Sequence, residues 1–201
     1  MNDSREHILF TSLKLFLQNS FKDVTMKQIV EQSGLSKGAF YHYFTSKEQV
    51  FEEALKYFYP DMVINDLIGL PEGSLKLFYK EVLRKLEENK KRSAKLLSGN
   101  EDQPFNANYY YLIFDAVKIL PHFKEKLFQQ QKEEIKIWVS RVYQARLSGE
   151  IKSPLSDLQI AKMFIYMGDG VGISMIMEEN TNKIKSELKS LWDGLYDSIK
   201  A

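Results

Sequence analysis

Cysteine is absent from the 201-residue sequence, and proline and glycine are scarce, with five and ten residues respectively. Without cysteine the chain has no disulfide and no thiolate metal site, and its composition fits a reducing cytoplasm. The long stretches between Pro and Gly are rich in Leu, Lys, Glu, Phe and Ile, which favours helices over a sheet protein with many turns. We therefore predict an all-α, cytoplasmic protein.

Neither sign of charge dominates, because 28 Lys and Arg are balanced by 27 Asp and Glu to give a formal net charge of +1. Residues 1–48 alone contain six Lys or Arg and five Asp or Glu. The sequence therefore lacks the broad basic face that would by itself indicate a nucleic-acid-binding protein. Any affinity for DNA must come from a few locally placed groups.

Long apolar runs are also lacking. The longest mostly apolar stretch, Met163 to Met177, contains Asp169 and three glycines, and is shorter than the roughly 20 residues that a membrane-spanning helix needs. Charged residues near the N-terminus do not resemble a secretory leader. We predict no membrane span. The 44% of hydrophobic and 13% of aromatic residues are enough for a buried core.

Helical spacing of apolar residues organises the N-terminal part of the chain. It predicts a first helix over residues 5–18, followed by two short helices that begin after the N-capping residues Thr25 and Ser36. Gly34 lies between the short helices, where a left-handed turn needs a residue without a side chain. These proportions are typical of a helix-turn-helix. A fourth helix is expected over 46–59, as a connector.

The start of the third helix is suited to a close approach to a DNA groove. Ser36, Lys37, Gly38 and Ala39 present a hydroxyl, a cation and two residues with little or no side chain. Polar-tipped rings follow at Tyr41, His42 and Tyr43, and Lys47 is expected to be exposed beside them, where it could contact phosphate. An aromatic cluster can also be plain core, which is the interpretation adopted for Phe40 and Phe44.

The run from Thr25 to Lys47, T-M-K-Q-I-V-E-Q-S-G-L-S-K-G-A-F-Y-H-Y-F-T-S-K, resembles the DNA-binding segment of the tetracycline-repressor-like (TetR) family of transcriptional regulators. The resemblance extends over roughly residues 5 to 55 and is carried by many positions at once. It implies a DNA-binding domain over 1–48 and a helical ligand-binding and dimerisation domain over 49–201. It also implies a cytoplasmic homodimer that binds near-palindromic operator DNA as a repressor released by a small molecule.

Carried over by position, the resemblance assigns DNA contacts to ten residues. Thr25 corresponds to a phosphate-contacting cap and Lys27 to a position that reads a base in some members. The start of the recognition helix corresponds to Ser36, Lys37, Gly38 and Ala39. Phosphate contacts correspond to Tyr41, His42 and Lys47, and the roles of His42 and Tyr43 are interchangeable at this stage.

Later helices are expected over 72–91, 104–120, 121 or 122–147, 155–179 and 182–200. The resemblance implies that the last two form the dimer interface. We expect one apolar stripe on each helix to form this interface, and small residues in the stripes would let the helices approach closely. The stripe of the first helix consists of Ala161, Ile165, Gly168, Gly172 and Met175, and that of the second consists of Ile184, Leu188, Leu191, Leu195 and Ile199. The alternative is that both stripes are buried within one subunit.

A small, largely apolar or aromatic effector is the expected ligand, because aromatic and Met side chains are dense in the C-terminal part. The candidate lining residues are Phe78, Tyr79, Tyr110, Phe114, Trp138, Met163 and Met167. Such residues can equally form plain core, although buried phenols require hydrogen-bond partners.

No catalytic constellation, metal cluster or cofactor motif is visible, since His7, His42 and His122 are scattered. We therefore predict that the chain is not an enzyme and uses no cofactor. The alternative functions are a DNA-binding or DNA-organising protein without a ligand and, less favoured, a small helical transferase.

Overall fold

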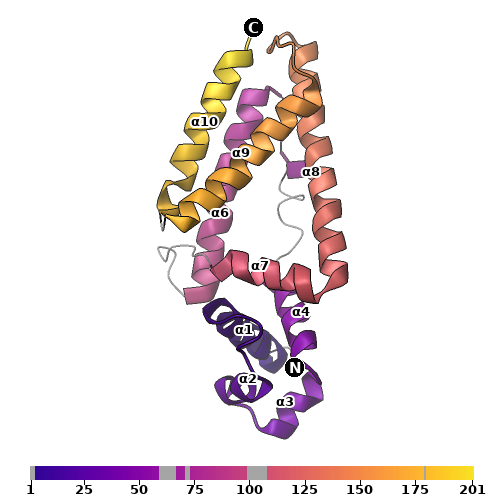
Figure 1. The fold of residues 1–201 in the computed structure, drawn as a ribbon, viewed down its shortest axis with the longest axis vertical. Coiled ribbons are helices and arrows are strands. Elements are labelled where there is room, and N and C mark those ends of the chain that lie inside the picture. Colours follow the sequence, from indigo (N-terminus) through magenta and orange to yellow (C-terminus); the bar gives the residue numbers. More distant parts are fainter. Residues whose placement is uncertain (1–2, 59–66, 71–72, 99–107, 179) are drawn as a thin grey trace. The chain divides into compact units, whose positions relative to one another are not determined.

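The computed structural model describes residues 3–58, 67–70, 73–98, 108–178 and 180–201, with the side chains of 3, 57–58, 92–98 and 108–110 excepted. The all-α prediction is confirmed, since the described elements of Figure 1 are helices joined by short connections. They are α1 (Asp3–Gln18), α2 (Met26–Ser33), α3 (Lys37–Tyr43), α4 (Lys47–Phe58), α6 (Leu75–Ser98), α7 (Asn108–Ile119), α8 (Pro121–Leu147), α9 (Asp157–Met177), the 3-10 turn η1 (Thr181–Lys183) and α10 (Ile184–Ile199).

Contacts group these helices into two compact units, residues 1–60 with 107–127 and residues 61–106 with 128–201. This division differs from the predicted boundary after residue 48, because both α4 and α7 pack with the N-terminal helices. Asp115 on α7 illustrates the reason: its carboxylate accepts a hydrogen bond of 2.8 Å from the backbone N–H of Phe21. Helix α7 also buries Leu112 and Ala116 in this first unit. Sequence spacing could not reveal this long-range pairing.

The first unit has an aromatic core where α1, α4 and the loop after α1 meet. The rings of Phe16, Phe21 and Phe51 lie within 5.8 Å of one another, centroid to centroid. Aromatic pairs at such distances contribute beyond their burial of area. Ile8, Val50 and the fully buried Phe44 complete a core that fixes the base of the short helices.

The second unit is built on α6, α9 and α10, which surround a larger aromatic cluster. Trp138 of α8 stacks on Phe164 of α9 at 5.0 Å, and Trp192 of α10 meets both rings edge-on. The Trp192 N–H donates to the Phe164 carbonyl at 2.9 Å. Helices α9 and α10 pack against each other (Figure 1), so the opposite face of each helix does not take part in this contact.

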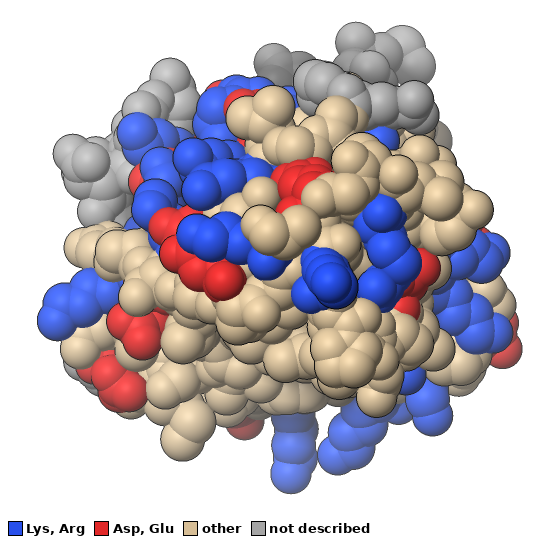
Figure 2. Space-filling model, turned by 90° about the horizontal axis from the view of Figure 1, so that it is seen from above, with Lys and Arg blue, Asp and Glu red and all other residues tan. Residues whose placement is uncertain are grey.

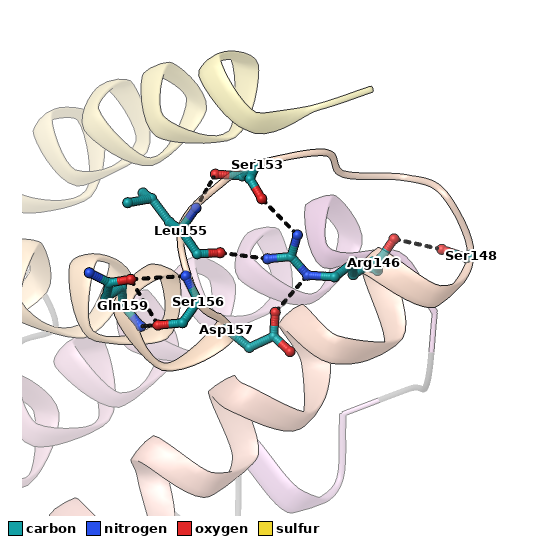
Figure 3. Close-up of polar contacts among 8 residues, drawn as sticks. Arg146, Ser148, Ser153, Leu155, Ser156, Asp157 and Gln159 are labelled. Atoms are coloured by element: carbon teal, nitrogen blue, oxygen red, sulfur yellow. Dashed lines mark hydrogen bonds and ion pairs between the residues drawn. The ribbon is translucent and has the colours of Figure 1, made fainter.

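The connection from α8 to α9 is held by Arg146 (Figure 3). Its guanidinium pairs with Asp157 at 2.8 Å and donates to the carbonyls of Ser153 and Leu155 at 2.9 and 2.7 Å. Ser156 then caps α9 in a reciprocal capping box with Gln159. These contacts fix the start of α9 against the end of α8.

Helix α9 has 21 residues and passes a length and composition test for a membrane span, with a mean hydropathy of 1.3. The predicted reason against a span, too short an apolar stretch, is therefore wrong. One such helix is weak evidence, because the core helix of a globular protein passes the same test. Here Phe164, Ile165, Val171 and other residues of α9 are buried within the second unit.

Charged side chains of both signs are interspersed on the face that Figure 2 shows. Lys and Arg lie beside Asp and Glu and between areas of uncharged surface. Most ion pairs described are exposed pairs within one helix, such as Lys136 with Glu133 and Lys27 with Glu31. Such pairs contribute little to stability.

Candidate functional site

Helices α2 and α3 form a capped helix-turn-helix. Thr25 caps α2, its side chain accepting from the N–H of Gln28 at 3.2 Å while the Gln28 side chain accepts from the Thr25 N–H at 2.7 Å. Gly34 ends α2 with φ +65°, the left-handed conformation expected of it. Ser36 caps α3 by accepting from the N–H of Ala39 at 3.3 Å. The predicted turn and both predicted caps are confirmed.

The start of α3 is exposed, and two of its residues, Gly38 and Ala39, have little or no side chain. Ser36, Lys37, Gly38 and Ala39 are all exposed, whereas Phe40, the next residue, is fully buried and anchors the helix from behind. A Cβ placed on Gly38 would meet no atom within 4 Å. Gly38 is therefore not required by packing inside this protein, so the bare surface it leaves is available to a partner.

The aromatic residues that follow divide between the surface and the core. Tyr41 is 40% exposed and lies edge-on to Phe40, and the Lys37 ammonium is 6.0 Å from its ring. His42 is exposed and Tyr43 half-buried, with their rings 5.4 Å apart. The better exposed member of the interchangeable pair is therefore His42. Thr25 and Lys27 are also exposed, at the start of α2.

Lys47 does not have the exposed position that the sequence predicts. Its ammonium donates to the carbonyls of Phe21 and Val24 at 2.8 and 2.6 Å and lies 4.2 Å from the Phe21 ring centroid. The charge therefore holds the loop between α1 and α2 against the first turn of α4. Periodicity could not show this, because the two carbonyls lie 26 and 23 residues earlier in the chain.

The predicted interface stripes of α9 and α10 are largely buried within one chain. Ala161, Ile165, Leu188 and Ile199 are at most 5% exposed, and a Cβ on Gly168 would lie 3.8 Å from the Trp192 ring. The remaining members are Gly172 and Leu195, also buried, Met175 and Ile184, packed against the core, and Leu191, which is 40% exposed. Except for Leu191, the assignment of this stripe to a partner is therefore corrected: it is the α9–α10 packing face.

The predicted lining residues differ in burial and lie in both compact units. Phe78, Tyr79 and Trp138 are at most 2% exposed, whereas Phe114, in the other unit, is 62% exposed. Met163 is 37% exposed, Met167 packs against the core, and the side chain of Tyr110 lies outside the described residues.

The buried phenols of the second unit have hydrogen-bond partners within the chain. Tyr79 donates to Asp193 at 2.6 Å, and Tyr196 donates to Glu150 at 3.0 Å. Burial raises the pKa of both phenols, and the neighbouring carboxylates raise it further. The unsatisfied phenol that would have indicated a ligand is therefore not present at these two positions.

A polar groove of about 630 Å³ lies elsewhere in the second unit, and none of the predicted lining residues faces it. Glu150 accepts from the N–H groups of Leu75 and Lys76 at 2.8 and 3.1 Å, so a carboxylate of the chain itself caps α6. Lys76, Arg141, Gln144 and Tyr196 are among its other lining residues.

Residues 8–54, which contain the capped helix-turn-helix, match a family model described as "Bacterial regulatory proteins, tetR family". Residues 8–54 are therefore a TetR-family DNA-binding segment. The chain is 39% identical over 85 residues to the uncharacterized HTH-type transcriptional regulator YerO of Bacillus subtilis, covering 42% of this chain and 29% of that one. It is 43% identical over 47 residues to the transcriptional repressor NemR of Escherichia coli, covering 23% and 24%.

The fold of the chain resembles solved structures over its whole length. A regulator from Saccharomonospora viridis, solved in complex with choline, matches with a TM-score of 0.68 over 100% of both chains at 16% identity. At that identity the likeness shows the fold alone. By sequence, the chain aligns with less than a third of the length of either curated relative.

Proposed function

We propose that this protein is a homodimeric transcriptional repressor that binds near-palindromic operator DNA through α2 and α3 and is released by a small molecule. The observation that carries the DNA-binding part is the exposed, capped start of α3, with a glycine that internal packing does not require. N–H groups at a helix start and small side chains suit close approach to a groove. The NemR name supports repression, and the family supports a cytoplasmic location.

Lys37 and Lys47 form a matched pair that tests this proposal. Lys37→Ala should weaken operator binding and reduce the salt dependence of log Kd by about one unit of slope, with the melting temperature unchanged, because an exposed cation is lost. Lys47→Ala should instead destabilise the protein by about 2 kcal/mol, because two carbonyls lose a charged donor. Fluorescence anisotropy over a salt series and thermal melts measure both quantities on a selected operator.

The opposite pattern would overturn the roles of this pair. If Lys47→Ala leaves the melting temperature unchanged and flattens the salt slope, Lys47 is a phosphate contact as the sequence predicts. If the wild-type protein selects no DNA sequence from a random pool, the DNA-binding proposal fails as a whole.

The outer face of α9 is the surface that supports a dimer. Leu158, Tyr166, Ile173 and Met177 lie on one side of the helix and are 46%, 48%, 46% and 79% exposed. Leu191 adds an exposed apolar side chain on α10, and a Cβ on Gly170 or Gly194 would meet no atom within 4 Å. Apolar side chains alternating with such open positions fit a second helix pair approaching closely. We propose that this outer face pairs with a second copy.

Ile173→Glu should therefore convert the dimer to a monomer at micromolar concentration, because it replaces an exposed apolar side chain of the outer face by a charged one. Sedimentation velocity measures the oligomeric state. Leu77→Glu is the matched control, since Leu77 is an exposed leucine on α6 and should leave the dimer intact. A dimeric Ile173→Glu variant would show that the interface lies elsewhere.

A further inference from the structure

The polar groove of about 630 Å³ in the second unit is lined by the start of α6, the last turns of α8 and the end of α10. Ser140 and Gln144 lie one turn apart on the α8 wall and are exposed, so the groove opens to solvent. Trp138, Phe164 and Trp192, which form the aromatic core of this unit, do not line it. The groove is therefore separate from any ligand site inside that core.

The acidic side chain in the groove, that of Glu150, is already engaged. Its carboxylate accepts from the N–H groups of Leu75 and Lys76 at 2.8 and 3.1 Å, and from the Tyr196 hydroxyl at 3.0 Å. The negative charge also faces the positive end of the α6 dipole. The start of α6 is thus satisfied within the chain and is not itself open to an anion.

Lys76 and Arg141 bring two positive charges to the groove, and neither forms an ion pair with a carboxylate in the described part of the chain. The Lys76 ammonium lies 5.1 Å from the Tyr196 ring centroid, and the Arg141 guanidinium lies 5.3 Å from that of Phe78. These contacts use the ring faces. Arg141 also donates to the Leu70 carbonyl at 3.1 Å, which leaves most of its N–H donors without an acceptor.

Asp193 does not take up the charge of Lys76. Hydrogen bonds from Lys189 and Tyr79 are the main causes that lower the pKa of Asp193, and the charge of Lys76 contributes less. The Asp193 carboxylate pairs with Lys189 at 2.5 Å and accepts from the Tyr79 hydroxyl at 2.6 Å. Lys76 therefore remains available to a partner from outside the chain.

Neutral donors accompany the two cations. The side chains of Ser140 and Gln144 line the same groove and form no hydrogen bond with the described residues. Lys76 and Arg141 are both half-buried, and cations that lose exposure are usually paired. A guanidinium, an ammonium, a hydroxyl and an amide that face one open space are suited to an anion that carries further polar groups.

We propose that this groove binds a phosphomonoester with a hydroxylated body, that is, a sugar phosphate. Lys76 and Arg141 would hold the phosphate, because a guanidinium fork matches two phosphate oxygens and an ammonium adds a point charge. Ser140 and Gln144 would form hydrogen bonds with the hydroxyl groups of the body. The volume of about 630 Å³ is within the usual range for an organic ligand, and is larger than a bare phosphate ion needs. This site goes beyond the proposed function and does not depend on operator release.

The experiment is isothermal titration and thermal melting of the full chain with glucose 6-phosphate, inorganic phosphate and glucose at constant ionic strength. Glucose 6-phosphate should bind with a Kd below about 1 mM and raise the melting temperature, because it binds the folded state. Inorganic phosphate should bind about tenfold more weakly, since it lacks the hydroxyl groups that Ser140 and Gln144 contact. Glucose should not bind, because it lacks the charge.

Four variants divide the site into its parts. Lys76→Gln should weaken glucose 6-phosphate binding about tenfold, with little change in melting temperature, because the backbone N–H that caps against Glu150 is kept. Arg141→Lys keeps the charge without the fork and should weaken binding less. Gln144→Leu should reduce the affinity for glucose 6-phosphate but not for inorganic phosphate. Lys80→Gln is the matched control, since Lys80 is an exposed lysine one turn further along α6 that does not line the groove.

Equal losses in Lys76→Gln and Lys80→Gln would overturn the proposal, because they would indicate general attraction by surface charge. Equal affinities for glucose 6-phosphate and inorganic phosphate would do the same, as would no binding of glucose 6-phosphate at about 10 mM. Operator binding by the ligand-free protein is measured separately. A failed titration would thus leave the DNA-binding proposal standing, and failed DNA binding would leave the groove standing as a phosphate site.

Discussion

Replacing Gly38 with leucine should weaken operator binding by about 100-fold or more, about 2.7 kcal/mol, while the protein remains folded. A Cβ at this position has no atom within 4 Å, so the new side chain starts in open space. In the complex it would instead lie between the start of α3 and the groove, and would hold the helix away from the bases. Anisotropy titration with the operator measures the loss, and circular dichroism measures the fold.

Gly38→Ala provides the matched control for this prediction. Alanine in a helix is more stable than glycine, so this variant should gain about 0.5 kcal/mol in free energy of unfolding while losing some DNA affinity. Stability and binding would then move in opposite directions, which a general folding defect cannot produce. Wild-type affinity in Gly38→Leu would show that this end of α3 does not enter the groove.

The helix-turn-helix could be predicted because its signals are local. The capping box of Thr25 with Gln28, the cap at Ser36 and the left-handed Gly34 each involve residues within three positions of one another. The bounds of α2 and α3 follow directly from these contacts.

The partners of long side chains could not be predicted, since they depend on tertiary structure. The carbonyls that receive the Lys47 ammonium come from a loop more than twenty residues away. Asp115 likewise contacts the Phe21 N–H across 94 residues, which places α7 in the first unit. Nothing in the local pattern distinguishes these side chains from exposed ones.

Periodicity also could not show whether the same chain or a partner subunit covers an apolar stripe. The sequence assigns the stripe through Ala161, Ile165 and Gly168 to a partner subunit, whereas α10 of the same chain packs on it. The outer face of α9 was missed because Lys162, Asp169 and Gly170 interrupt it. The half-buried Glu134 of α8 was missed for a related reason: a single charged residue in a long helix usually lies on the surface.

The pH dependence of stability provides a measure of the cost of burying Glu134. The pKa of Glu134 is about 7 in the folded protein, whereas the ordinary value is 4.5. Between these values the folded state keeps a proton that the unfolded state has released, so the free energy of unfolding should fall as pH rises from about 4.5 to about 7. The full shift corresponds to at most about 3 kcal/mol, and partial access of water reduces this to about 2 kcal/mol.

Glu134→Gln should remove this slope, because the amide has nearly the same shape and does not ionise. Its free energy of unfolding should match that of the wild type near pH 5 and exceed it by about 2 kcal/mol at pH 8, as measured by urea denaturation at each pH. Asp169→Asn should flatten the slope partly, since it removes the charge that adds to the effect of burial. Glu133→Gln should leave the slope unchanged.

The lowered pKa of Glu52 affects stability with the opposite sign. The stabilisation by Glu52 is lost only as pH falls below about 4.5, outside this interval. Parallel pH profiles of Glu134→Gln and the wild type would therefore show that Glu134 is not a buried, uncompensated acid.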